Sequence, residues 1–181
     1  MSKVWFTSDL HFGQQRTLDL SMRPFENVKE MDFIMMNNWN ALVKPDDTIF
    51  ILGDFGIMKI LPFLNGKKVL IKGNYERQVP QLLEGFEPQF KEIYEEKHMI
   101  QVNKNGKEYF ITMVHEPSRV KNIPIDETHI NLFGHVHKLC MVKPYGLNVG
   151  TDIHCFAPVD FDTILFYHDA ILNYYDEDVF Y

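Results

Sequence analysis

The sequence has 181 residues, of which 45% are hydrophobic and 24% charged, and its formal net charge is -7. This length suits one domain, so we expect a single domain over residues 1–181 that buries a substantial apolar core. The acidic balance argues against a broad electrostatic grip on long nucleic acid, because that binding depends on cations facing phosphates. No apolar run is long enough to span a membrane, and the N-terminus lacks a basic segment followed by an apolar one, which predicts a cytoplasmic protein.

The first half of the chain carries the pattern of alternating strands and helices. Residues 4–8 form a β-branched and aromatic run, which predicts a buried strand, and residues 48–52 and 68–72 predict two more. Between the first two, apolar residues recur at steps of three and four from Val28 to Leu42, which predicts a helix with one buried face that ends before Pro45. This alternation favours parallel pairing of the strands.

The second half changes character. Residues 99–102 and 109–114 flank an Asn-Gly turn signal at positions 105 and 106, which predicts an antiparallel hairpin. Residues 128–133 and 147–149 predict further strands, and Asp160 is placed to cap a helix. The fold class we predict is therefore α/β, with two packed sheets of parallel and antiparallel strands flanked by helices.

The two cysteines, Cys140 and Cys155, do not form a CxxC pair. Two cysteines in a chain of this size fit a reducing compartment better than a disulfide framework. We predict that both are small core residues.

Polar side chains follow directly on the predicted strands. They are Asp9, His11, Asp54, Asn74, His115, His135 and His137. Open α/β sheets place their ligands in the loops at these strand ends. Residues two apart on a flat strand point to opposite faces, so Asp9 with His11, or His135 with His137, converge only where the backbone bends. We expect Gly13 and Gly134 to supply that freedom.

The residue types indicate a metal centre. Imidazole, carboxylate and amide oxygen together suit divalent manganese, iron, zinc or nickel, of which manganese is our first choice. With Asp9 and Asp54 as the charged ligands, two divalent ions leave a net charge of roughly +2 at the site. Such a centre attracts an anion.

The blocks DxH, GD, GN, H and GHxH occur in this order from Asp9 to His137, and in this the sequence resembles the calcineurin-like metallophosphoesterases. The resemblance implies a four-layered αββα sandwich of two mixed sheets. It also implies that Asp9, His11 and His137 hold one ion, that Asn74, His115 and His135 hold the other, and that Asp54 bridges them. The implied activity is hydrolysis of small phosphodiesters or nucleotides by a hydroxide shared between two metal ions.

The sequence departs from the family at one position. The family's third block usually continues with histidine after Gly-Asn, whereas here it reads Gly73-Asn74-Tyr75-Glu76. In relatives that histidine is thought to protonate the leaving group, and a phenol is a much weaker acid than an imidazolium. We therefore expect acidic leaving groups and phosphodiesters to be handled better than unactivated alkyl monoesters.

The predicted catalytic residues are Tyr75, Asn74 and His115, and the predicted substrate contacts are Arg16 and Arg119, because guanidinium matches phosphate oxygens. His98, His129, His154 and His168 belong to no block, and we expect structural roles for them, with a substrate contact left open for His154.

Two alternatives stay open at this stage. The chain could be a catalytically weakened metal-binding scaffold of the same fold that docks another protein, which the loss of the histidine favours. A nuclease acting on long DNA is disfavoured by the acidic charge. The expected partner is a small phosphorylated substrate, with no membrane partner, and an oligomer is left open.

Overall fold

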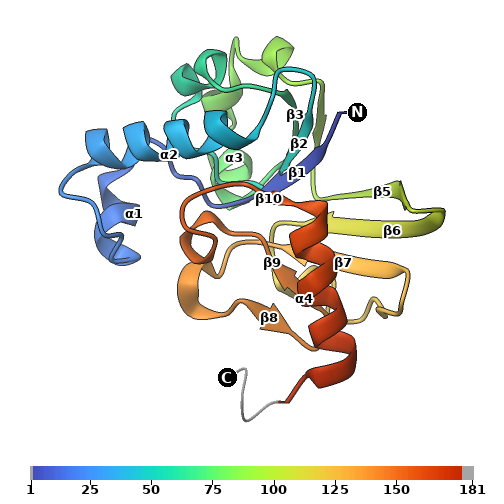
Figure 1. The fold of residues 1–181 in the computed structure, drawn as a ribbon. Coiled ribbons are helices and arrows are strands. Elements are labelled where there is room, and N and C mark those ends of the chain that lie inside the picture. Colours follow the sequence, from blue (N-terminus) through green and yellow to red (C-terminus); the bar gives the residue numbers. More distant parts are fainter. Residues whose placement is uncertain (1, 177–181) are drawn as a thin grey trace.

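The computed structural model describes residues 2–176 as an α/β fold with two mixed five-stranded sheets (Figure 1). In the first sheet the order is β10-β1-β2-β3-β4, with β1 to β4 parallel and β10 antiparallel to β1. Its strands are β1 (Val4–Thr7), β2 (Thr48–Ile51), β3 (Lys67–Ile71), β4 (Glu92–Tyr94) and β10 (Val159–Asp160).

The second sheet has the order β5-β6-β7-β9-β8, with parallel pairs in the middle and antiparallel pairs at both edges. Its strands are β5 (Lys97–Lys104), β6 (Lys107–Val114), β7 (His129–Phe133), β8 (Val142–Lys143) and β9 (Gly146–Asn148). The hairpin of β5 and β6 turns at Asn105 and Gly106, which both have positive φ, as this two-residue turn requires. The predicted layered α/β sandwich of two mixed sheets with helices is confirmed.

Four α-helices accompany the sheets: α1 (Gln15–Leu20), α2 (Val28–Leu42), α3 (Asn74–Gln78) and α4 (Phe161–Tyr174). Six short 3₁₀ segments lie in the connections: Met58–Phe63, Pro80–Leu83, Glu87–Gln89, Pro117–Arg119, His137–Leu139 and Thr151–Ile153. The long helices begin at capping side chains. Asn27 accepts a hydrogen bond from the N–H of Glu30 at the start of α2, and Asp160 accepts one from the N–H of Thr163 at the start of α4.

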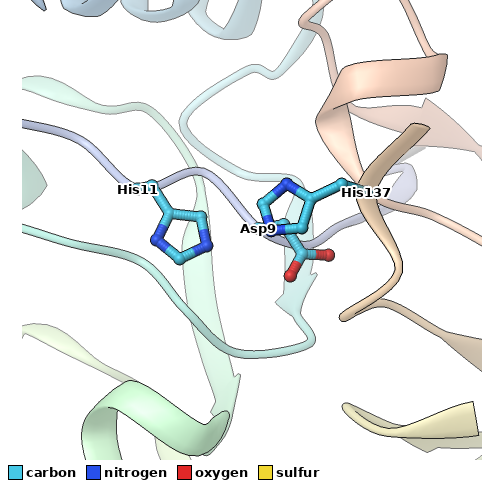
Figure 2. A group of neighbouring side chains, drawn as sticks. All are labelled: Asp9, His11 and His137. Atoms are coloured by element: carbon cyan, nitrogen blue, oxygen red, sulfur yellow. The ribbon is translucent and has the colours of Figure 1, made fainter. Parts of the chain in front are cut away.

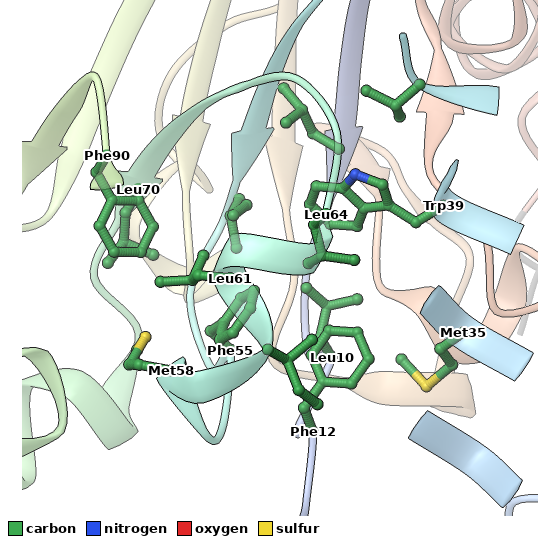
Figure 3. Close-up of a cluster of buried hydrophobic side chains, with 14 of the residues drawn as sticks. Leu10, Phe12, Met35, Trp39, Phe55, Met58, Leu61, Leu64, Leu70 and Phe90 are labelled. Atoms are coloured by element: carbon green, nitrogen blue, oxygen red, sulfur yellow. The ribbon is translucent and has the colours of Figure 1, made fainter. Parts of the chain in front are cut away.

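The helix α2 covers one face of the first sheet. Its buried residues Met31, Met35 and Trp39 pack in one cluster with Ile49, Ile51 and Leu70, and Figure 3 shows Trp39 and Met35 lying over this cluster. Each such buried side chain stabilises the fold by about 1.5–3 kcal/mol. Met31, Met35 and Trp39 of the periodic set are thus core, as predicted, whereas Val28 is half-buried and Leu42, at the end of the helix, is exposed.

The two sheets share a second core cluster. Residues that alternate with the first set, such as Phe50 and Val69, face Ile111, Met113 and Leu132 of the second sheet. The helix α4 enters the same cluster through Ile164 and Ile171. A third cluster of Val114, Val120 and Phe133 lies on the other face of the second sheet. This packing fixes the two sheets against each other, so that their strand ends meet.

One smaller expectation differs from the structure. Cys155 is exposed and Cys140 only partly buried, so the prediction that both are core residues is wrong for Cys155. Across residues 2–176, every helix falls short of the length and apolar character needed to cross a membrane.

Candidate metal centre

The seven predicted ligands all lie where strands end. Asp9 and His11 follow β1, Asp54 follows β2 and Asn74 follows β3, all three strands being parallel neighbours in the first sheet. His115 follows β6, and His135 and His137 follow β7, a parallel pair in the second sheet. Because the carboxyl ends of these strands meet, the loops of both sheets come together at one place.

Backbone hydrogen bonds hold the loops of the first sheet in contact. The N–H of Asp9 donates to the carbonyl of Gly53 at 3.1 Å, and the N–H of His11 donates to the carbonyl of Asp54 at 3.0 Å. A link to the second sheet comes from the N–H of His135, which donates to Oδ2 of Asp9 at 2.8 Å. Asp9 and its neighbours therefore tie the loop after β1 to the loops after β2 and β7.

Asp9, His11 and His137 form one group able to hold a cation. One ligand atom from each lies within 4.8 Å of the others, and Figure 2 shows Asp9 and His11 on one loop with His137 reaching them from a neighbouring loop. The rings of His11 and His137 are nearly parallel, with centroids 5.1 Å apart.

Asp54, Asn74, His115 and His135 gather beside this group. Asp9, Asp54 and His115 form a second possible cation group. Nε2 of His115 lies 2.8 Å from Oδ1 of Asn74, and Nδ1 of His135 lies 3.1 Å from the same oxygen. Oδ2 of Asp54 lies 3.6 Å from Nε2 of His11 and 3.4 Å from Nε2 of His115. The Asp54 carboxylate thus lies between the two groups.

Two ligand atoms fit a bound cation particularly well. In the described part of the chain, Oδ1 of Asp9 and Nε2 of His11 are buried and have no hydrogen-bond partner. Leaving such an atom unsatisfied costs about 1–3 kcal/mol. A divalent ion coordinated by both atoms removes this cost, so the donor set fits a metal ion.

The histidines are oriented by contacts of their other nitrogens. Nδ1 of His11 lies 2.8 Å from Oε1 of Gln14, and Nδ1 of His115 lies 2.7 Å from the carbonyl oxygen of Leu52. Because these oxygens accept hydrogen bonds, each Nδ1 carries a proton, which leaves Nε2 as the nitrogen that would present a lone pair to a metal ion. This arrangement is typical of metal-binding histidines.

Burial and neighbouring carboxylates pull the pKa values of the imidazoles in opposite directions. Burial lowers the pKa of His11 overall, despite the charges of Asp9 and Asp54. Burial also lowers the pKa of His115, but its contacts with Asp54 and the charge of Asp9 outweigh this and raise the value to about 9. In the absence of metal, a proton on His115 therefore compensates part of the buried negative charge.

Five ligand residues adopt the left-handed backbone conformation that is uncommon outside glycine. They are Asp9, His11, Asp54, His135 and His137, with φ between 48° and 72°. Such residues each cost about 1–3 kcal/mol and persist where the surroundings hold them. The expectation that neighbouring glycines supply the bend is therefore only half right: Gly13 has a φ of 73°, whereas Gly134 has no positive φ.

Gly134 is needed for a different reason. A Cβ atom there would lie 1.9 Å from Oγ of Ser8 and 2.6 Å from Oδ2 of Asp9. At Gly73, a Cβ atom would lie 2.2 Å from Oδ1 of Asp54. The glycines before Asn74 and His135 thus let the ligand loops approach the carboxylates of the neighbouring loops.

Sequence reasoning missed three residues that support the site. Glu76 is fully buried, and its carboxylate accepts hydrogen bonds from the N–H groups of Gly73, Asp54 and Phe55. Arg23 and Asp152 form a buried ion pair behind the Asp9 loop. Glu76 was visible as the last residue of its block, whereas nothing in the sequence joins Arg23 to Asp152.

A pocket of about 270 Å³ opens over the ligands. Its walls include Tyr75, Arg16 and Leu20 as well as His11, Thr17, Asp54, Asn74, His135 and His137. The ring of Tyr75 meets the ring of His11 edge-on at 4.9 Å between centroids, and the N–H of Tyr75 donates to Oδ1 of Asp54. Three of the residues predicted to contact substrate or take part in catalysis, Arg16, Asn74 and Tyr75, therefore lie at the pocket.

Arg119 is placed differently from Arg16. Its guanidinium donates to Glu116 at 2.9 Å and to Glu96 at 2.8 Å, and it is not among the residues that line the pocket. Its role as a substrate contact stays a prediction, which now requires these ion pairs to be released.

The histidines outside the blocks have structural contacts. The ring of His168 lies 2.7 Å from the carbonyl oxygen of Asp126, and His129 pairs with the Asp126 side chain. His98 stacks on Tyr94, and Nε2 of His154 lies 2.9 Å from the carbonyl oxygen of Asn148. His154 is not among the pocket residues. These contacts agree with the structural role expected for them.

Comparison with known proteins gives one archaeal relative and two phage relatives. No family model matches the chain. An uncharacterized protein of Methanocaldococcus jannaschii is 27% identical over 178 residues, which cover 91% of this chain and 90% of that protein. The gene 66 proteins of mycobacteriophages L5 and D29 are 36% and 35% identical over 89 residues, or 44% of this chain and 42% and 43% of theirs.

Among solved structures, a protein of unknown function from Aquifex aeolicus aligns with a TM-score of 0.64 and 22% identity over 91% of this chain and 98% of its own. The two proteins therefore share a fold. A novel archaeal phosphodiesterase aligns with a TM-score of 0.38 and 17% identity over 88% of this chain and 98% of its own, a likeness too distant to carry a functional conclusion.

Proposed function

We propose that this protein is a divalent-metal-dependent phosphoesterase that hydrolyses small phosphodiesters or nucleotides. The observation that carries the proposal is the convergence of seven oxygen- and nitrogen-bearing side chains at one place, with Oδ1 of Asp9 and Nε2 of His11 buried and unpaired within the described residues. Imidazole, carboxylate and amide ligands match borderline divalent metals such as manganese. The order of the blocks along the sequence, which resembles that of the calcineurin-like metallophosphoesterases, supports the same assignment.

The proposed ligands divide into two sets. Asp9, His11 and His137 would hold one ion and Asn74, His115 and His135 a second, with Asp54 between them. Two divalent ions, when bound, supply positive charge for phosphate oxygens and lower the pKa of a bound water. The carboxylate of Asp54 is held in place for this role by the N–H of Tyr75.

The pocket residues determine how a substrate would be bound. Arg16 offers a cation for a non-bridging phosphate oxygen, and Leu20 offers an apolar wall next to it. Tyr75 can donate a hydrogen bond to a departing oxygen but is a weak acid for full protonation. The substrates favoured are accordingly esters whose leaving groups need little protonation.

Purified protein assayed on bis-p-nitrophenyl phosphate and p-nitrophenyl phosphate tests the proposal. We expect turnover with added manganese, loss after chelation and recovery when manganese is restored. Asp54→Asn should abolish turnover, whereas Asp47→Asn, which alters a buried carboxylate bonded to Trp5 and to the N–H groups of Lys3 and Lys44, should retain it. Stoichiometric metal binding without turnover of either ester would favour the scaffold alternative instead.

A further inference from the structure

A buried arginine lies directly behind the loop that carries Asp9 and His11. Arg23 is 5% exposed, and its guanidinium donates to the carbonyl oxygen of Asp9 at 2.6 Å and to that of Leu10 at 2.8 Å. Most arginine side chains expose their guanidinium group to water, and a buried guanidinium requires acceptors for its N–H groups. Its contacts fix the backbone of Asp9, one of the residues in the left-handed conformation.

Asp152, the counterion of Arg23, also contacts His137, another member of the same ligand set. Asp152 accepts from Nε of Arg23 through Oδ1 at 2.9 Å and from Nη2 through Oδ2 at 2.9 Å, a two-point pair between residues 129 positions apart. Oδ2 of Asp152 also lies 2.9 Å from Nδ1 of His137. One continuous chain of contacts therefore runs from the Asp9 loop through Arg23 and Asp152 to His137.

We propose that Arg23 and Asp152 are positioning residues for the ion that Asp9, His11 and His137 would hold, an inference that rests on the proposed function. The Asp152 carboxylate accepts a hydrogen bond from Nδ1–H of His137, so Nε2 of that ring keeps its lone pair and the ring keeps its orientation. Arg23 keeps this carboxylate charged in a buried place and holds the Asp9 loop at a set distance from it. Among residues 2–176, the two side chains contact oxygen and nitrogen atoms only of each other, of this ligand set and of Leu10, and none of Asn74, His115 or His135.

The inference can be tested because Arg23 and Asp152 contact the ligands of only one of the two proposed ions. Asp152→Asn keeps the size of the side chain but removes its charge, and it no longer favours the Nδ1–H form of His137. Binding of Mn²⁺ to the two sites is measured by competition with a chelator. We expect one of the two affinities to fall by about 10–100-fold, the usual effect of losing a partner that orients a ligand, and the other to stay nearly unchanged.

Asp47→Asn is the matched control. Asp47 is also buried and also accepts several hydrogen bonds, but its partners are Lys3, Trp5 and Lys44, outside the ligand loops. A purely structural role for Asp152 predicts that both variants lower thermal stability and neither changes one metal affinity selectively. The positioning role predicts the selective loss in Asp152→Asn alone.

A second variant decides the question if Asp152→Asn does not fold. Arg23→Lys keeps the positive charge but loses the two-point geometry of the ion pair with Asp152. It should lower the affinity for the same one of the two ions, while thermal melting shows that the variant is folded. The d–d absorption of bound Co²⁺ gives an independent signature, because only the spectrum of the affected ion should shift.

The outcomes separate the two proposals. A wild-type protein that binds no divalent ions overturns the proposed function. A wild-type protein that binds two ions, with both affinities unchanged in the folded variants or both lowered equally, leaves the proposed function in place and overturns the role assigned to Arg23 and Asp152.

Discussion

Replacing Glu76 with glutamine should weaken the tie between the loops that carry Asp54 and Asn74. The buried Glu76 carboxylate accepts the N–H of Gly73 and of Asp54 at Oε2, both at 2.9 Å, and the N–H of Phe55 at Oε1, at 2.8 Å. It thereby joins the start of α3 to the end of β2. Glutamine has the same shape but offers one oxygen and one NH₂ group.

The size of the effect follows from these three contacts. In Glu76→Gln at least one backbone N–H faces a donor in place of an acceptor. A hydrogen bond to a charged group contributes about 1.5–3 kcal/mol, and a buried donor without a partner costs about 1–3 kcal/mol. We therefore expect the free energy of unfolding to fall by about 3 kcal/mol, which a domain with a stability of about 5–15 kcal/mol survives.

Urea unfolding of the chelator-treated protein, followed by the fluorescence of the buried Trp5 and Trp39, measures this loss. Removing metal first separates the hydrogen bonds from any effect of bound ions. Glu84→Gln, at an exposed site, is the matched control and should change stability by less than about 0.5 kcal/mol. A loss below about 1 kcal/mol in Glu76→Gln, with an unchanged urea slope, would refute the role given to this carboxylate.

Three further predictions concern the pocket and its ligands. Tyr75→His should raise turnover of esters with poor leaving groups relative to p-nitrophenyl esters, and an unchanged ratio would contradict the proton-donor argument. Arg16→Ala should raise KM for a phosphodiester several-fold with little effect on kcat. Arg119→Ala should raise KM by less, because Arg119 is paired with two glutamates. Equal KM values for the wild-type protein and both variants would count against a phosphate contact at either position. Because the pKa of His115 is raised to about 9, its protonated ring should stabilise the metal-free fold fully below pH 6.5, and this stabilisation should be lost as the pH rises through 9. The free energy of unfolding of the wild-type protein and of His115→Gln, measured at pH 6 and at pH 10, checks this. An equal difference between the two proteins at both pH values would contradict it.

The sequence predicted the elements whose patterns are long or repeated. The helix α2 spans Val28 to Leu42, the range over which the apolar residues recur at helical spacing ahead of Pro45. The strands β1, β2 and β3 were found because each is a buried run that ends at a ligand block. The same blocks predicted the seven residues that the structure brings together.

Short and edge elements escaped prediction for physical reasons. The helix α1 has six residues and no capping side chain, and the edge strands β4 and β10 have three and two residues. Such elements are held by pairing with neighbours rather than by their own periodicity. The pairing of Arg23 with Asp152 was equally invisible, since it joins residues 129 positions apart that share no pattern.

The left-handed backbone at Asp9 and Asp54 affects how this centre is best dissected by mutagenesis. Alanine at either position would remove the ligand, and it would also disfavour the left-handed conformation that the fold requires there. The loop would then shift, and the effect of this shift would be mistaken for the effect of lost coordination. Asparagine accepts that conformation readily and keeps one oxygen in place. Asparagine scanning therefore reports on the carboxylates alone, and the difference between paired alanine and asparagine variants measures how firmly the surrounding fold imposes the geometry.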